Sequence, residues 1–226
     1  MNIRIALVIL FCQISMISSY CQVTIKNIDS TLSRIFKKLQ KSNRDLISDS
    51  IGPLFKEQLK KYLLLPITFN NKLDSLETLI TIKQSPDKKI KFYSWDELSG
   101  GSWHEMNAFA QFKTAGNKVS SQQIDTDEEM KEGGYTDSKI VEVNEIKENG
   151  KVYYVTFGWG THGSGNQHMI IQVFRIVGNK LRKCPAFHPN QRELVIEYPR
   201  WKKLGLEFDK QTNSISFNYT KYYINL

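Results

Sequence analysis

The chain has 226 residues, is 40% hydrophobic and 12% aromatic, and has a formal net charge of +8. That length is enough for one domain with a substantial apolar core. The lysines are scattered singly along the expected strands and hairpin tips, where they keep strand edges soluble, so we expect no nucleic-acid partner despite the basic charge. After residue 21 the remaining cysteine is Cys184, which excludes a disulfide-stabilised scaffold.

The first 21 residues have the pattern of a secretory signal peptide. Arg4 gives a positive start, Ile5 to Cys12 form an apolar run too short to span a bilayer, and Ser19-Tyr20-Cys21 is a small-x-small end. We therefore predict removal of residues 1–21, with cleavage near Cys21 and export to the periplasm or the extracellular space. A lipoprotein anchor on Cys21 is the alternative, which the bulky Tyr20 disfavours. No later run is long or apolar enough for a transmembrane segment.

Residues 22–66 form the predicted N-terminal helical segment. The pattern predicts helices over residues 29–65, with Asp29 or Ser30 capping the first helix and Gly52-Pro53 separating it from a second one that ends before Pro66. The apolar residues recur at helical spacing in two stripes, which are Leu32, Ile35, Phe36 and Leu39, then Phe55, Leu59, Tyr62 and Leu63. We expect both stripes to pack on a β layer.

Residues 67–226 form the predicted antiparallel β domain, because the hydrophobic period changes to two from residue 77 onward. Short turn signals such as Ser85-Pro86-Asp87 and Asn149-Gly150 separate strand partners, and Asn-Gly supplies the positive φ angles of a tight hairpin. The expected strands are 77–83, 90–95, 103–113, 118–124, 139–147, 151–159, 167–177, 180–186, 193–197, 204–209 and 213–219.

The hairpin tips predict a polarity for this sheet. They fall near residues 86, 116, 149, 178 and 211. If sequential strands pair, the tips gather at one end and the longer connections, 96–102, 125–138, 160–166 and 187–203, gather at the other. The predicted fold class is α+β, with short N-terminal helices packed on an antiparallel β-hairpin meander that forms a sandwich, an open barrel or a bent sheet.

Most chemically distinctive residues fall at the end with the longer connections. The candidate ligand-binding residues there are Asp96, Trp103, His104, Trp159, His162 and His168. Indoles stack on flat ligands while polar groups orient them, so the pattern predicts a rim that binds a glycan or a peptide. The alternative interpretation is that the rings plug the end of the β core.

No spacing in the sequence assigns a catalytic residue. A metal-assisted hydrolase using His104, His162, His168 and a rim carboxylate is the alternative function, but no metal-binding motif is present and no cofactor is expected. There is no Gly-x-Ser-x-Gly elbow, and the glycines of residues 158–165 precede a β-branched run rather than the helix that a phosphate loop needs. The leading hypothesis is an exported, non-enzymatic binding or envelope-accessory domain.

One stretch resembles a known group of proteins. The strand Lys89-Ile-Lys-Phe-Tyr-Ser-Trp-Asp96, followed by Gly100-Gly-Ser-Trp-His104, is similar to a Tyr-Ser-Trp-Asp strand and Gly-Gly-Thr-Met-His turn in uncharacterised secreted proteins from Bacteroidetes. Here Ser102 and Trp103 replace the Thr and Met. The resemblance covers roughly residues 70–125 and implies export from a Gram-negative cell, without an assigned activity or catalytic residue.

Overall fold

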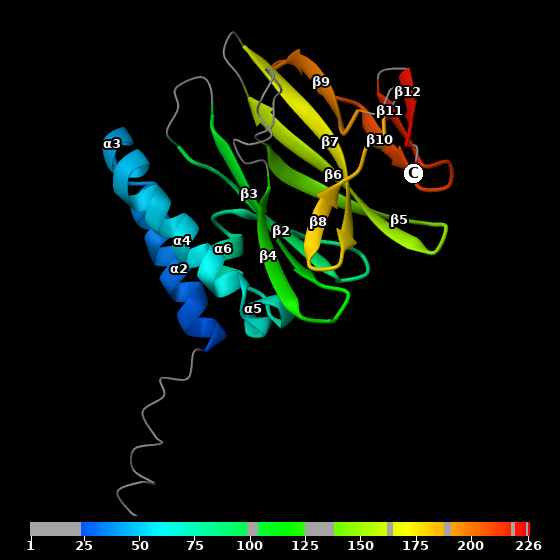
Figure 1. Ribbon diagram of the computed structural model, residues 1–226. Coiled ribbons are helices and arrows are strands. Elements are labelled where there is room, and N and C mark those ends of the chain that lie inside the picture. The colour runs from blue at the N-terminus through cyan, green and yellow to red at the C-terminus, as the bar shows by residue number, and fades with distance from the viewer. Residues whose placement is uncertain are drawn as a thin grey trace, which may run out of the picture.

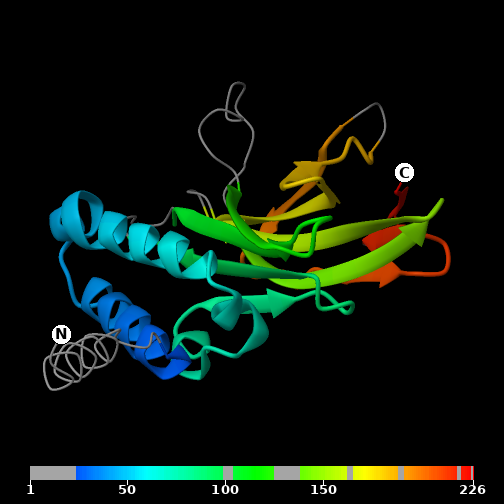
Figure 2. The same cartoon turned by 60° about the horizontal axis from the view of Figure 1, so that its bottom comes forward.

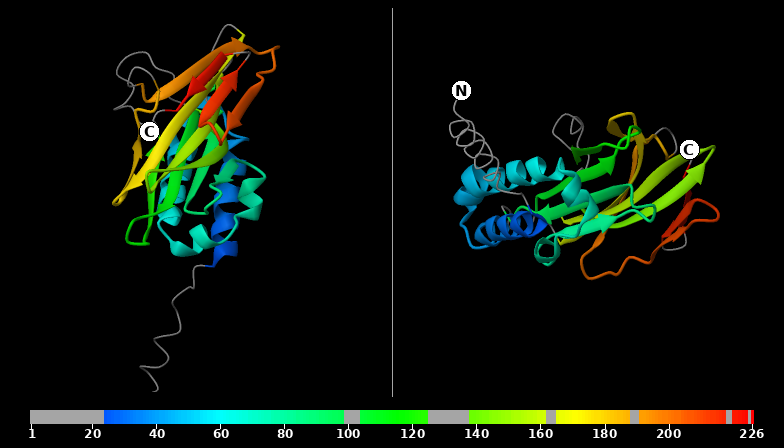
Figure 3. Two further views of the ribbon diagram at one scale, coloured as in Figure 1. Left: turned by 90° about the vertical axis from the view of Figure 1, so that its right-hand side faces the viewer. Right: turned by 90° about the horizontal axis from the view of Figure 1, so that it is seen from below.

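The fold stacks a helical layer and three antiparallel sheets (Figures 1 and 3). The computed structural model describes residues 24–98, 104–124, 138–161, 165–187, 191–217, 220–224 and 226. The helical elements are α2 (Ile25–Leu39), α3 (Arg44–Leu46), the π-helical turn η2 (Ile47–Ile51), α4 (Gly52–Leu63), α5 (Pro66–Asn70) and α6 (Asp74–Glu77). The α+β class predicted from the sequence is confirmed, and over the described residues the sheets do not close into a barrel.

Each sheet is built mainly from strands that are neighbours in sequence. The first sheet contains β1 (Thr81–Gln84), β2 (Ile90–Asp96), β3 (Met106–Lys113) and β4 (Val119–Ile124) in that order. The second contains β5 (Lys139–Glu148), β6 (Lys151–Thr161), β7 (Asn166–Val177) and β8 (Lys180–Lys183), with β9 (Glu193–Pro199) also paired to β7. The third contains β10 (Leu206–Asp209), β11 (Ser214–Phe217) and β12 (Thr220–Tyr223).

The helices begin differently from the sequence prediction. Thr24, rather than Asp29 or Ser30, is the N-cap of α2, because its Oγ1 accepts a hydrogen bond from the Asn27 amide at 3.2 Å. Asp29 caps another helix instead. Its carboxylate oxygens accept the Ser75 and Leu76 amides, both at 2.9 Å, and so bind the start of α6 to the middle of α2. Pro53 lies in the first turn of α4 as predicted. The predicted break at Gly52-Pro53 is wrong, because residues 44–63 are helical without interruption and the helical layer is interrupted at residues 40–43 instead.

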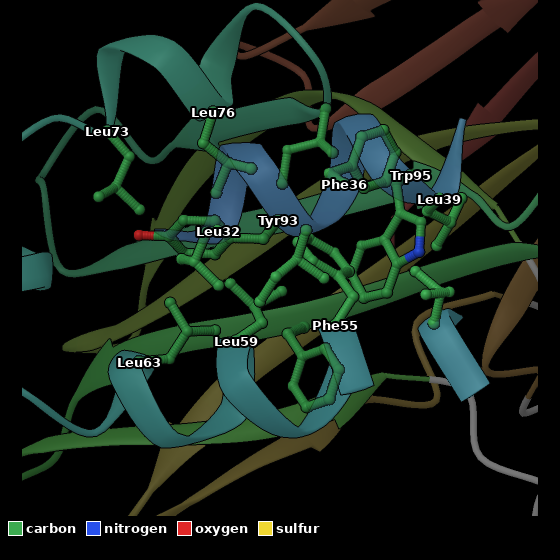
Figure 4. Close-up of a cluster of buried hydrophobic side chains, with 14 of the residues drawn as sticks. Leu32, Phe36, Leu39, Phe55, Leu59, Leu63, Leu73, Leu76, Tyr93 and Trp95 are labelled. Carbon is green, nitrogen blue, oxygen red and sulfur yellow. The ribbon is translucent and has the colours of Figure 1, made fainter. Parts of the chain in front are cut away.

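Helices α2 and α4 lie on one face of the first sheet (Figure 2). Their predicted apolar stripes share a buried cluster with residues of that sheet. Phe55 of α4 lies edge-on to Trp95 of β2 with 5.1 Å between ring centroids, and Trp95 stacks on Phe109 of β3 at 6.1 Å. Figure 4 shows these helical side chains converging on Tyr93 and Trp95. The helices and the first sheet therefore share one core.

A buried amide fastens the end of α4 to this core. Gln111 of β3 is fully buried and accepts a hydrogen bond from the Tyr93 hydroxyl at 2.8 Å. Its Nε2 donates to the Leu63 carbonyl at 2.7 Å and to Thr68 Oγ1 at 2.8 Å. Burial raises the pKa of the Tyr93 hydroxyl far above its ordinary value, so this group stays a hydrogen-bond donor at physiological pH.

The hairpin turns follow the predicted chemistry. Asn149 and Gly150 have φ angles of 51° and 71°, the geometry expected of an Asn-Gly turn between β5 and β6. Two strand predictions need correction. Residues 77–80 are not extended, because α6 ends at Glu77 and β1 begins at Thr81. The predicted strand 213–219 is present as the shorter β11, and β12 is an additional strand that was not predicted.

The first and second sheets form a sandwich that side-chain hydrogen bonds hold at two places. Between them lies a core of residues such as Phe92, Phe112 and Phe174. At one place Ser94 Oγ of the inner strand β2 accepts the Ile140 amide of the edge strand β5 at 2.9 Å. At the other, the Gln122 side chain of the edge strand β4 bonds both backbone groups of Leu181 in the edge strand β8, each at 3.1 Å.

A glycine permits the close approach of β5 to β6. A Cβ atom placed on Gly158 would lie 2.1 Å from Ser138 Oγ and 2.6 Å from Ser138 Cβ. Gly158 lies within β6 and makes room for the buried Ser138.

Candidate functional site

The end of β2 holds a carboxylate–imidazole pair in a fixed geometry. Asp96 Oδ2 lies 2.5 Å from His104 Nδ1, and Asp96 Oδ1 accepts the Leu98 amide at 2.8 Å. The Leu98 backbone has a positive φ of 60°. Both carboxylate oxygens are therefore engaged, while the side chains of His104 and Asp96 keep 37% and 25% of their surface exposed.

A row of paired residues extends this site across the second sheet. His104 forms an isolated antiparallel bridge with Thr161, which is opposite Gln167 of β7, which in turn is opposite Tyr198 of β9. Directly opposite residues of antiparallel strands present their side chains on the same face. The bridge thus joins the Asp96–His104 pair to the end of the second sheet.

Trp159 lies on this same face, two residues before Thr161 in β6. Its indole N–H donates to Gln167 Oε1 at 3.0 Å, and the Lys139 ammonium lies 5.3 Å from its ring centroid. A small cavity of about 120 Å³ has Asp96, Leu98 and Lys139 in its wall. Lys139 therefore connects the surroundings of Trp159 with those of Asp96.

His168 is separated from the other candidates. It is opposite Gly160 and Glu197 in the register, so its side chain points to the face opposite that of Trp159, and it is only 1% exposed. Trp103 and His162 lie outside the described residues. The structure thus brings together Asp96, His104 and Trp159 of the predicted set, and it buries His168.

This arrangement does not support the alternative function, a metal-assisted hydrolase. Within the described part of the chain, no group of three or more His, Cys, Asp or Glu side chains could hold a metal ion. Of the three predicted ligands, His104 and His168 are described and do not form such a group, and His162 is not described.

A buried glutamate anchors the other side of the same turn. Glu97 follows Asp96, and its side chain is only 6% exposed where it meets Lys56 of α4 at 2.8 Å. Gly52 leaves space for this carboxylate, because a Cβ at Gly52 would lie 3.1 Å from Glu97 Oε2. Burial raises the pKa of the Glu97 carboxyl, and the Lys56 ammonium opposes that change in part.

We expect Glu97 to make stability depend on pH. Since its folded pKa lies above the unfolded value, the fold gains stability as the pH falls through the folded pKa, and the full gain is present below the unfolded pKa. Glu97→Gln should be at least as stable as the wild type at neutral pH and should lose this part of the gain on acidification. Denaturant unfolding at about pH 7 and about pH 5 measures the difference.

Glu57→Gln is the control for this experiment, since Glu57 is an exposed neighbour of Lys56 on α4. It should keep the wild-type pH dependence. A Glu97→Gln protein with an unchanged pH profile would contradict the assignment.

A cavity of about 690 Å³ lies at the opposite, hairpin-tip end. Residues from four hairpins line it, including Lys89, Ala115, Gly150 and Gly178. The fifth hairpin reaches the same end, where Asn213 donates to Glu148 at 3.4 Å. The predicted gathering of hairpin tips is therefore confirmed.

Two of the cationic side chains that line this cavity are engaged by aromatic rings. The Lys113 ammonium lies 5.5 Å from the Phe69 ring centroid, and the Arg175 guanidinium lies 6.0 Å from that of Tyr153. Both cations line the cavity but rest on aromatic rings. Tyr154 in its wall is also engaged, because its hydroxyl donates to Asp87 at 3.0 Å.

Trp201, which is not among the predicted site residues, is 84% exposed in the turn after β9. The signal was present in the run Pro199-Arg-Trp-Lys-Lys203, where an indole lies among cations in a turn-forming stretch. This turn follows Tyr198 directly and so borders the row that contains Thr161 and Gln167.

Comparison with known proteins returned no family model, no curated protein and no solved structure that matches this chain. Among the described residues, no helix has both the length and the apolar character needed to cross a membrane.

Proposed function

We propose that the chain is an exported, non-enzymatic binding domain whose site is the face around Asp96, His104 and Trp159, referred to below as the rim. The supporting observation is that a fixed carboxylate–imidazole pair is bridged to the second sheet at Thr161, two residues after an oriented indole, and that Lys139 connects this indole with a small cavity beside Asp96. The export part of the proposal rests on residues 1–21, which lie outside the described residues.

The rim offers the groups that a glycan or a peptide uses. The Asp96–His104 pair can exchange hydrogen bonds with a hydroxyl or an amide, and Trp159 offers ring surface for a sugar or side chain. The indole is already oriented by Gln167, so less side-chain freedom is lost on binding. The cavity beside Asp96 is large enough for a small polar group rather than a whole ligand.

Glycan and peptide arrays should identify the ligand, and calorimetry on variants should then locate the site. We expect Trp159→Ala and His104→Ala each to weaken binding at least about tenfold, because each removes a group at the centre of the contact. Alanine substitutions at Trp103 and His162 test these two predicted residues in the same way, since they flank the described residues His104 and Thr161 in sequence.

Leu64→Ala is the control, because Leu64 is 52% exposed at the end of α4, within the helical layer. This variant should bind as the wild type does. Ligands that bind equally well to the Trp159 and His104 variants, after thermal melts show both to be folded, would place the site elsewhere.

A further inference from the structure

The turn between β9 and β10 presents an indole to solvent. Trp201 has 84% of its surface exposed, more than any other large hydrophobic residue in the described part of the chain. Single exposed aliphatic residues are common on protein surfaces, but a tryptophan left this open gains nothing from the core.

Backbone bonds fix this turn to the end of the second sheet. The Lys202 amide donates to the Pro199 carbonyl at 3.0 Å, which closes a four-residue turn with Trp201 at its third position. The Arg200 amide donates to the Gly165 carbonyl at 3.0 Å, and its Nε donates to the Asn166 carbonyl at 3.3 Å. Trp201 is therefore held out by an ordered turn.

The charges beside the indole have one sign. Lys202 and Lys203 are both exposed, and no Asp or Glu occurs from residue 198 to residue 206. Tryptophan favours the interface between lipid headgroups and acyl chains, and lysine side chains at that depth contact anionic phosphates. The indole and the ammonium groups on this turn therefore match both the headgroup region and the anionic phosphates of such an interface.

We propose that this turn docks the domain on a bilayer that contains anionic phospholipids. Trp201 enters the headgroup region, and Lys202 and Lys203 contact lipid phosphates. Insertion of one indole and contact of the ammonium groups with phosphates are each weak attractions, so the attachment is reversible and is not a permanent anchor. Because β7 begins at Asn166 and Gln167 follows it, docking holds the rim close to the lipid surface. This inference does not depend on the rim having a ligand.

Sedimentation with lipid vesicles tests the proposal on the chain without residues 1–21. We expect binding to phosphatidylcholine vesicles that contain about one-third phosphatidylglycerol, no binding to phosphatidylcholine alone, and release at about 0.5 M salt. Lys202→Gln and Lys203→Gln should each weaken binding about fivefold. Trp201→Ala should weaken it about tenfold and should remove a blue shift of tryptophan fluorescence seen with the wild type.

Matched variants separate the turn from the net charge. The double variant Lys60→Gln/Lys61→Gln removes as much charge as the turn pair Lys202→Gln/Lys203→Gln, but from exposed positions on α4, and it should leave vesicle binding within about twofold of the wild type. The proposal is overturned if no vesicle binds, if the α4 pair weakens binding as much as the turn pair, or if Trp201→Ala has no effect. It is also overturned if binding to a soluble polyanion depends on Trp201, Lys202 and Lys203 while binding to the vesicles does not.

Discussion

Replacing Gly158 by alanine is expected to destabilise the fold by about 3 kcal/mol. The added methyl would lie 2.1 Å from Ser138 Oγ, and rotation of the hydroxyl is no remedy because Ser138 Cβ would be only 2.6 Å away. The backbone of β5 must therefore move, and the Ile140 amide that donates to Ser94 moves with it. Urea unfolding monitored by circular dichroism measures the loss.

A second substitution tests this explanation. In the double variant Ser138→Gly/Gly158→Ala the clashing atoms are gone, so at least half of the lost stability should return. Gly116→Ala is the control, because its added Cβ would meet Thr114 Oγ1 at a comfortable 3.9 Å, and it should change stability by less than about 0.5 kcal/mol. A Gly158→Ala protein as stable as the wild type would show that Ser138 does not fix the approach of the strands.

Replacing Phe55 by alanine is expected to cost about 4 kcal/mol, the largest single effect predicted for this chain. Phe55 is fully buried and makes ring contacts with both Phe36 of α2 and Trp95 of β2. Its removal leaves a cavity where the helical layer meets the first sheet. Neither the helices nor the sheet can move into this cavity without losing contacts that they make elsewhere in the core. Denaturant unfolding gives the change in free energy.

The adjacent residue provides the control. Leu54 is 41% exposed on the same turn of α4, so Leu54→Ala should change stability by less than about 1 kcal/mol. If the two variants lose equal stability, the helices do not depend on the core that they share with the first sheet.

Local patterns in the sequence predicted most of this fold. The Asn149-Gly150 turn dictates the positive φ angles that a hairpin needs, and the apolar stripe around Phe55 dictates the buried face of α4. Contacts made over long sequence separations were not accessible in this way. Gln122 bonds Leu181 across 59 positions, and nothing near either residue indicates the other.

The candidate site was predictable in part for the same reason. Asp96 and His104 are close in sequence at either side of one turn, so their proximity follows from the β2–β3 hairpin. The burial of His168 depends on the register between β6 and β7, and a change of one residue in their connection would turn it to the other face. Periodicity alone leaves that register open.

The bond from Asp29 to the start of α6 has a consequence for the order in which the chain can fold. Helix α2 is synthesised first, but the amides that its carboxylate accepts come 46 and 47 positions later, and the aromatic ring of Phe109 comes later still. Helix α2 can meet α4 early, but it cannot complete its final set of contacts until more than a hundred residues have been made. If the chain is exported as proposed, it would still be incompletely folded while these residues are made, and so could pass through a membrane channel.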